Sequence, residues 1–159
     1  MIPCVCVLLL AYAALHDVVG RTIPNGVPAS LAALGCLRAA LAHTIAPSLW
    51  IATMIFLAAT LAWRKGLLGG GDVKLLAAIS LVVTPHEVPV LLISISMVGG
   101  MLAILYVFAG KVLPQPQPVR PRHLVRRAIR AELWRVHRRG PLPYAVAIAL
   151  GTMTQIVGH

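Results

Sequence analysis

The sequence predicts an all-α protein that crosses a membrane about six times, with residues 1–159 forming a single membrane-embedded domain. Hydrophobic residues make up 59% of the 159 residues, and the mean hydropathy is +0.88. Soluble domains of this size are much less apolar. The apolar residues form separate runs, and the basic residues gather in alternate segments between them. These observations together indicate a polytopic membrane protein.

Each apolar run is a candidate spanning helix. A straight span needs roughly 20 residues, so the shorter runs must extend into their polar flanks or cross a thin bundle. The first run ends near a small-residue pattern typical of signal peptides, but no Lys or Arg precedes it, so we expect it to be retained. The six runs are residues 2–14, 27–42, 46–63, 73–84, 88–112 and 142–157.

The net charge of +10 follows the order of the connecting segments. The first, third and fifth segments contain Arg21, then Arg64 and Lys65, then the nine basic residues of 111–139, whereas the second and fourth contain none. The positive-inside rule places the odd segments in the cytoplasm and both termini in the periplasm of a bacterium. The charge therefore predicts orientation in an inner membrane, without a nucleic-acid partner.

Residues 113–140, in the fifth segment, combine a Pro-rich linker with a basic helix. Alternating prolines in 113–122 favour an extended chain. The following residues carry an apolar stripe at helical spacing among arginines, which suits a cytoplasmic helix lying on anionic membrane lipids. A solvated helix or a docking surface for a partner are the alternatives.

No metal ion or cofactor is expected. Cys4, Cys6 and Cys36 lie in apolar runs without metal-ligand spacing, and the six histidines are scattered. His16 stands beside Asp17 as a conceivable base, but no second ligand or base accompanies it at a known spacing.

The chain has only two aspartates, Asp17 and Asp72, and the predicted topology puts both at cytoplasmic ends of spans. Each has a structural explanation, because Asp17 can pair with Arg21 and Asp72 can cap the fourth helix. Carboxylates near hydrocarbon are costly, however, and usually mark a function. Two of them together would share a proton and could activate a water for aspartic proteolysis.

Three glycines, Gly69, Gly70 and Gly71, directly precede Asp72. They leave the backbone free of side chains, so an extended peptide could lie against it. A flexible turn is the other explanation.

These residues resemble a known family. The stretch GGGD at 69–72 matches the G-x-G-D motif of intramembrane aspartic proteases, while DVVGRTIPN at 17–25 and Lys74 resemble the type IV prepilin peptidase branch. PLPYAVAIALG at 141–151 is similar to its closing span. The resemblance implies that Asp17 and Asp72 are catalytic. It implies motif positions for Gly69 and Gly71 and supporting roles for Arg21, Ile23, Pro24, Asn25 and Lys74. As a separate hypothesis, Arg21 or Lys74 holds an acidic residue of the substrate just past the cut.

The resemblance also implies the substrate. Family members remove the basic leader of prepilins at the cytoplasmic face, after a glycine that precedes the apolar segment. Longer members add a domain with paired CxxC motifs that methylates the new amino terminus, and this chain lacks both the motifs and the length. It resembles the short, peptidase-only form of tight-adherence (Flp) pilus systems, whose assembly machinery is a further expected partner. The basic insert at 113–140 is its least family-like part.

Two other functions stay open at this point. A non-catalytic pilus-assembly scaffold or small carrier would use the aspartates only to cap helices and bind cations. A related protease would cut signal peptides or other membrane segments, although D-x-x-x-R-x-I-P-N favours prepilins. The sequence gives no oligomeric state.

Overall fold

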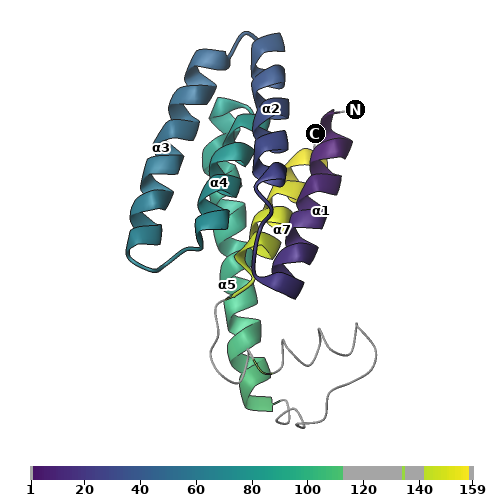
Figure 1. Ribbon diagram of the computed structural model, residues 1–159, viewed down its shortest axis with the longest axis vertical. Helices are drawn as coiled ribbons and strands as arrows, with labels where there is room; N and C mark the ends of the chain where they lie inside the picture. Colours follow the sequence, from purple (N-terminus) through teal and green to yellow (C-terminus); the bar gives the residue numbers. More distant parts are fainter. Residues whose placement is uncertain (1, 113–133, 135–141, 158–159) are drawn as a thin grey trace.

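The computed structural model describes residues 2–112, 134 and 142–157, and these residues form helices and no strand. The predicted all-α class is therefore confirmed (Figure 1). The predicted linker and basic helix at 113–140 lie outside the described residues, apart from Trp134. The elements are α1 (Ile2–Gly20), α2 (Gly26–Leu41), α3 (Ile45–Arg64), α4 (Gly70–Val82), the 3₁₀ helix η1 (Pro85–Glu87), α5 (Val88–Val112) and α7 (Tyr144–Val157).

Three stretches among the described residues are long and apolar enough to cross a membrane: Ile2–Gly20, Ile45–Arg64 and Pro85–Val112, which joins η1 to α5. The protein is therefore a membrane protein with several spans. The helices α2, α4 and α7 have 16, 13 and 14 residues, fewer than the roughly 20 of a straight span. Whether all six helices cross stays a prediction.

The helices run alternately in opposite directions along the bundle (Figure 1). The start of α1 and the end of α7 lie at one end, and the connections α1–α2 and α3–α4 lie at the other. The short helix α4 packs against α2 and α3, while α7 packs against α1 and α5. Since neighbours cover α4 so thoroughly, eight of its residues are buried.

Two glycines allow the closest helix contacts. A Cβ on Gly35 of α2 would lie 2.6 Å from the Cβ of Leu81 in α4, and a Cβ on Gly151 of α7 would lie 2.8 Å from the Cα of Ile95 in α5. Small residues at such crossings let helix backbones approach within a membrane, where packing replaces the hydrophobic effect.

Arg38, a basic residue inside the second apolar run, has a hydrogen-bond partner within the bundle. Its Nη2 donates a hydrogen bond to the carbonyl oxygen of Val83, the residue that follows α4. The last carbonyls of a helix lack intrahelical donors, so this contact satisfies one of them. It also ties the end of α2 to the end of α4.

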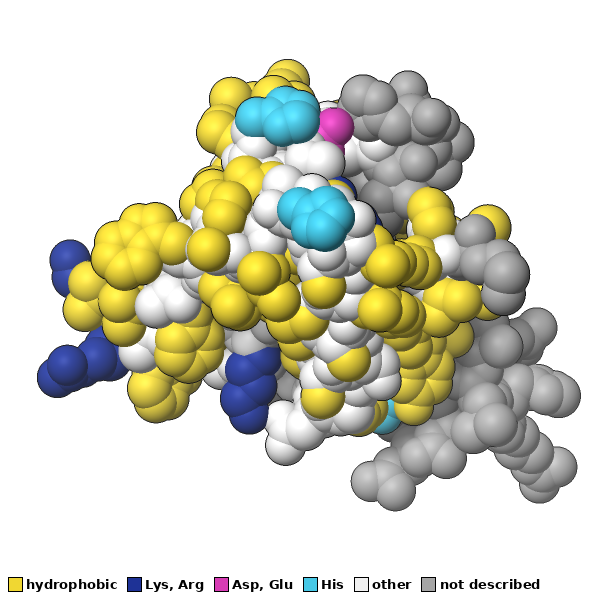
Figure 2. Space-filling view, turned by 90° about the horizontal axis from the view of Figure 1, so that it is seen from above, with side chains coloured by type: hydrophobic (Ala, Val, Ile, Leu, Met, Phe, Trp, Pro, Cys, Tyr) yellow, Lys and Arg dark blue, Asp and Glu magenta, His cyan; other side chains and the backbone are white. Residues whose placement is uncertain are grey.

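Hydrophobic side chains cover much of the described surface seen from above (Figure 2). Large side chains such as Leu8, Trp50, Met97 and Phe108 are well exposed. A soluble monomer rarely presents so much continuous apolar surface, whereas lipid tails would cover it.

Candidate active site

The turn after α1 brings the loop residues 21–25 back across the helix end. The N–H of Arg21 donates to the carbonyl of Asp17 at 2.9 Å, and Arg21 has a left-handed backbone with φ 53°. Nδ1 of His16 donates to the carbonyl of Thr22 at 2.6 Å. Pro24 then accepts the N–H of Val27 at 3.0 Å, which starts α2. His16 thus closes the turn.

Asp17 lies in the last turn of α1 and is only 8% exposed. Its Oδ2 accepts a hydrogen bond of 3.2 Å from the N–H of Ala145, the second residue of α7. The first amides of a helix have no intrahelical acceptor and carry partial positive charge, so a carboxylate is favourable there. The start of α7 therefore holds Asp17 in place.

Asp72 is the third residue of α4, because that helix begins at Gly70, three residues before the predicted run. Its Oδ2 accepts the N–H of Gly69 at 3.2 Å. This is the capping contact expected from the sequence, and it fixes the carboxyl against the glycine turn.

The three glycines differ in the space around them. A Cβ on Gly69 would lie 2.8 Å from Oδ2 of Asp72, and one on Gly71 would lie 3.1 Å from the Cβ of Ile23. A Cβ on Gly70 would meet only the Trp63 ring, at 3.6 Å, which is an ordinary contact. A side chain at the first position would therefore displace the Asp72 carboxyl and one at the third would press on Ile23, whereas the second position has room.

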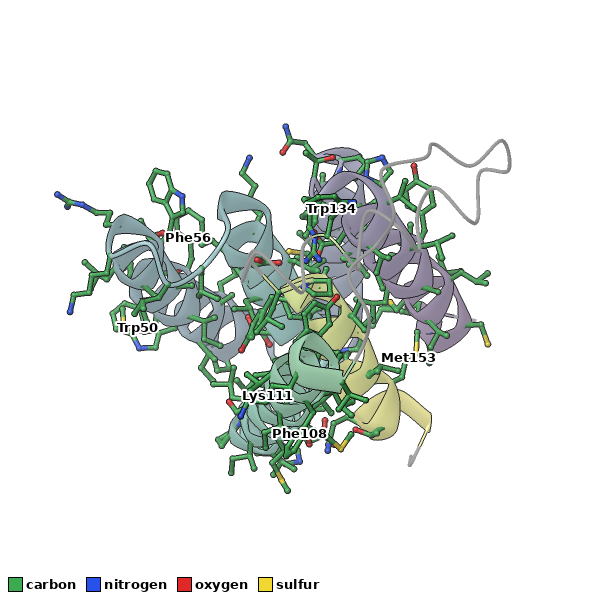
Figure 3. The ribbon with its side chains drawn as sticks, turned by 90° about the horizontal axis from the view of Figure 1, so that it is seen from below. Trp50, Phe56, Phe108, Lys111, Trp134 and Met153 are labelled. Atoms are coloured by element: carbon green, nitrogen blue, oxygen red, sulfur yellow. The ribbon has the colours of Figure 1, made fainter. Side chains whose placement is uncertain are left out.

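A cavity of about 260 Å³, which we call the polar cavity, opens between the α1–α2 turn and the start of α4. Figure 3 looks at the bundle from below, onto the end where these connections lie. The cavity brings together nearly all the residues singled out in the sequence. Its lining residues are Asp17, Arg21, Thr22, Ile23, Asn25, Gly69, Gly70, Gly71, Asp72 and Lys74.

Lys74 of α4 lines the polar cavity and reaches Asn25, the residue before α2. Its Nζ donates a hydrogen bond of 2.9 Å to Oδ1 of Asn25. Both side chains are exposed, so the ammonium group has remaining donors for another acceptor. The cavity thus combines two carboxyl groups with two cationic side chains, Arg21 and Lys74.

One motif residue lies outside the polar cavity, and two residues outside the predicted set contribute to the site. Pro24 does not line the polar cavity and instead shapes the turn before α2. Thr22 lines the cavity and Ala145 contacts Asp17, and neither was predicted. The contact of Ala145 uses only its backbone N–H, which has no signature in the sequence.

The fold and this cavity define a helical membrane protein in which acidic and basic side chains from distant helices meet in one polar site. A model of the type IV leader peptidase family matches residues 4–104, a range that includes Asp17, Asp72 and all of α2 to α4. The chain belongs to this family, as its motifs suggested, and is therefore a peptidase whose substrates, as a family, are prepilins. Comparisons with curated proteins and with solved structures gave no match.

Proposed function

We propose that the protein is an aspartic endopeptidase that removes the leader of Flp-like prepilins, with Asp17 and Asp72 as the catalytic pair. The observation that carries this proposal is the polar cavity, in which carboxyl groups from α1 and α4 face one space. These are the only aspartates of the chain, and both lie in the range that the family model matches.

The chemistry needs no metal. Two neighbouring carboxyl groups do not ionise together readily, so one keeps a proton while the other is a carboxylate. The carboxylate takes a proton from water as the water oxygen bonds to the scissile carbonyl carbon. The protonated carboxyl donates to the carbonyl oxygen. The C–N bond then breaks as the nitrogen takes the proton that was removed from the water, and a hydroxyl of the intermediate returns a proton to the other carboxyl. A new acid and a new amine leave, and the pair is restored.

The two carboxyl groups are held by hydrogen bonds from two different parts of the fold. Ala145 donates to Asp17 from the start of α7, and Gly69 donates to Asp72 from the glycine turn. The hydrogen bond of Asp72 uses only Oδ2, so its other oxygen remains for water or substrate.

The proposed reaction takes place at the cytoplasmic face of a bacterial inner membrane. Arg21 and Lys65 lie in the two connections that share one end of the bundle, and Arg64 is the last residue of α3 at that end. The positive-inside rule assigns this end to the cytoplasm. Both termini then face the periplasm. The basic charge of 111–139 agrees with this orientation and is suited to anionic lipids.

The test is co-expression with the prepilins of the host, scoring leader removal for the wild type, Asp17→Asn and Asp72→Asn. Asparagine keeps a side-chain oxygen that can accept the N–H of Ala145 or Gly69, so the fold should survive. Cleavage should fall by roughly 10⁴-fold for either exchange, since the residues of a catalytic unit act together.

A structural role for the aspartates predicts a different result. Both carboxyls do bind helix N-termini, as a scaffold or carrier would require. Such a protein would keep its function in at least one asparagine variant. Full cleavage by either variant would refute the catalytic proposal, and a panel of signal-peptide substrates would show whether prepilins are preferred.

A further inference from the structure

A second hollow adjoins the polar cavity and has the opposite character. This hollow, which we call the apolar groove, has a volume of about 450 Å³ and lies between α2, α3 and α4. Its polar lining side chains are Asn25, Thr53 and Lys74. The hydroxyl of Thr53 donates to the carbonyl of Leu49 at 2.8 Å within α3, so it needs no outside partner.

The lining residues of the apolar groove follow a regular helical spacing. Each of the three helices contributes residues at i, i+3, i+4 and i+7, starting from Asn25 at α2, Leu49 in α3 and Lys74 in α4. Such positions form one continuous face of a helix. At 1.5 Å per residue, the three faces run alongside each other for about 10 Å, or two helical turns.

The arrangement of the helices leaves this groove open on one side. Figure 1 shows α4 between α3 and α2, and α4 packs closely on both, whereas α2 and α3 touch each other little. The faces of α2 and α3 thus form walls above a floor made by α4. Five of the lining residues are alanines. Phe56, labelled in Figure 3, is the last lining residue that α3 contributes.

The shape and lining fit one more helix. Three parallel or antiparallel faces with small side chains let a fourth backbone approach closely, which is the usual basis of helix association in membranes. An apolar helix recognised in this way places its own residues at i, i+3, i+4 and i+7 into the groove.

The groove and the polar cavity share two residues, Asn25 and Lys74, which are joined by their hydrogen bond of 2.9 Å. A bound polypeptide that occupies both hollows must therefore change from polar to apolar residues next to this hydrogen bond. A lipid tail would match the groove but has no group for the adjoining pair of carboxyls.

We propose that the apolar groove binds the substrate's membrane helix, at the part of the helix that directly follows the bond that is cut. This inference rests on the proposed function of the polar cavity. The groove would hold about two turns of the apolar helix that follows the scissile bond. The Asn25–Lys74 hydrogen bond marks the point where the substrate changes from an extended segment around the scissile bond to a helix.

Photo-cross-linking tests the location of this helix without requiring cleavage. Benzoylphenylalanine is placed at Thr53 in the Asp72→Asn protein, and at Met54 as a control, because Met54 follows Thr53 on α3 but does not line the groove and is 43% exposed. The full-length host prepilin is co-expressed. We expect cross-links from position 53 to the apolar segment of the prepilin, at least tenfold more than from position 54.

Filling the groove gives an independent readout. Ala32→Phe fills the wall of α2, whereas Ala33→Phe places the same ring on a neighbouring exposed position outside the groove. With Asp17 and Asp72 intact, kcat/KM for the full-length prepilin should fall about tenfold or more for Ala32→Phe and stay within about twofold for Ala33→Phe.

The outcomes separate this inference from the proposed function. Cross-links to lipid only, equal cross-linking from positions 53 and 54, or equal cleavage by the Ala32 and Ala33 variants would each overturn the groove assignment. Loss of cleavage in Asp17→Asn and Asp72→Asn would stand in any of these cases. Normal cleavage by those asparagine variants, in contrast, would refute the catalytic pair itself.

Discussion

An alanine scan of the three glycines before Asp72 tests the geometry of the candidate site most directly. The glycines are consecutive, so the three variants share one local sequence and differ only in what the new methyl group meets. At Gly69 it would lie 2.8 Å from Oδ2 of Asp72, whereas ordinary contact begins at 3.4 Å. The carboxyl oxygen must therefore withdraw by about 0.6 Å, the difference between these distances.

The expected loss follows from this displacement. A shift of about 1 Å in a catalytic group can lower the rate roughly 10²-fold. Gly69→Ala should thus reduce prepilin cleavage by about 10- to 100-fold, also because the hydrogen bond from its N–H to Oδ2 must lengthen. Gly71→Ala presses on Ile23 at 3.1 Å and should reduce it by about tenfold. Gly70→Ala should stay within about threefold of wild type.

The assay is cleavage of a purified prepilin in detergent or lipid, with thermal unfolding of each variant as the control for folding. Alanine is a better helix former than glycine by up to about 1 kcal/mol, so Gly70→Ala should keep or raise the melting temperature. Equal activity of all three variants, or the greatest loss at Gly70, would refute the steric reasoning.

The remaining predictions concern one supporting residue and two packing contacts. Lys74→Ala should raise KM about tenfold with little change in kcat if its ammonium group holds an acidic residue of the prepilin, and unchanged kinetics would remove that role. Arg38→Met should cost about 1–3 kcal/mol of stability because the Val83 carbonyl loses its donor. Thermal unfolding measures this loss, and an unchanged melting temperature would contradict the importance of the hydrogen bond. Gly151→Leu should destabilise the bundle by about 1–3 kcal/mol or prevent folding, while Gly100→Leu, which meets nothing within 4 Å, should be tolerated, and equal effects would argue against the close contact of α7 with α5.

The sequence predicted the helical class, and the bounds of α5 match the predicted run of 88–112. Long apolar runs leave few alternatives in a membrane, since every backbone group needs an internal partner. Helix ends were harder to predict. The first helix continues to Gly20, well past the apolar run that ends at Ala14. Its polar last turn is held by contacts such as those of Asp17 and His16.

The residues of the candidate site could be predicted where their side chains belong to a sequence motif. The motifs around Asp17 and Asp72 identified nine of the ten residues of the polar cavity, leaving out Thr22. The partner of Asp17 could not be found in this way, because a backbone N–H of α7 donates the bond. The apolar groove was equally hidden, since alanines on three helices gain meaning only when those helices are placed side by side.

The hydrogen bond between Asp17 and Ala145 joins two residues that are 128 positions apart. During synthesis, the first helix enters the bilayer long before the final one leaves the ribosome. A nascent chain that ends after α5 would already contain every residue of the polar cavity, yet one carboxyl would lack the amide that orients it. Insertion of the last helix is thus the step that completes the hydrogen bonding of Asp17 and fixes its carboxyl in the polar cavity.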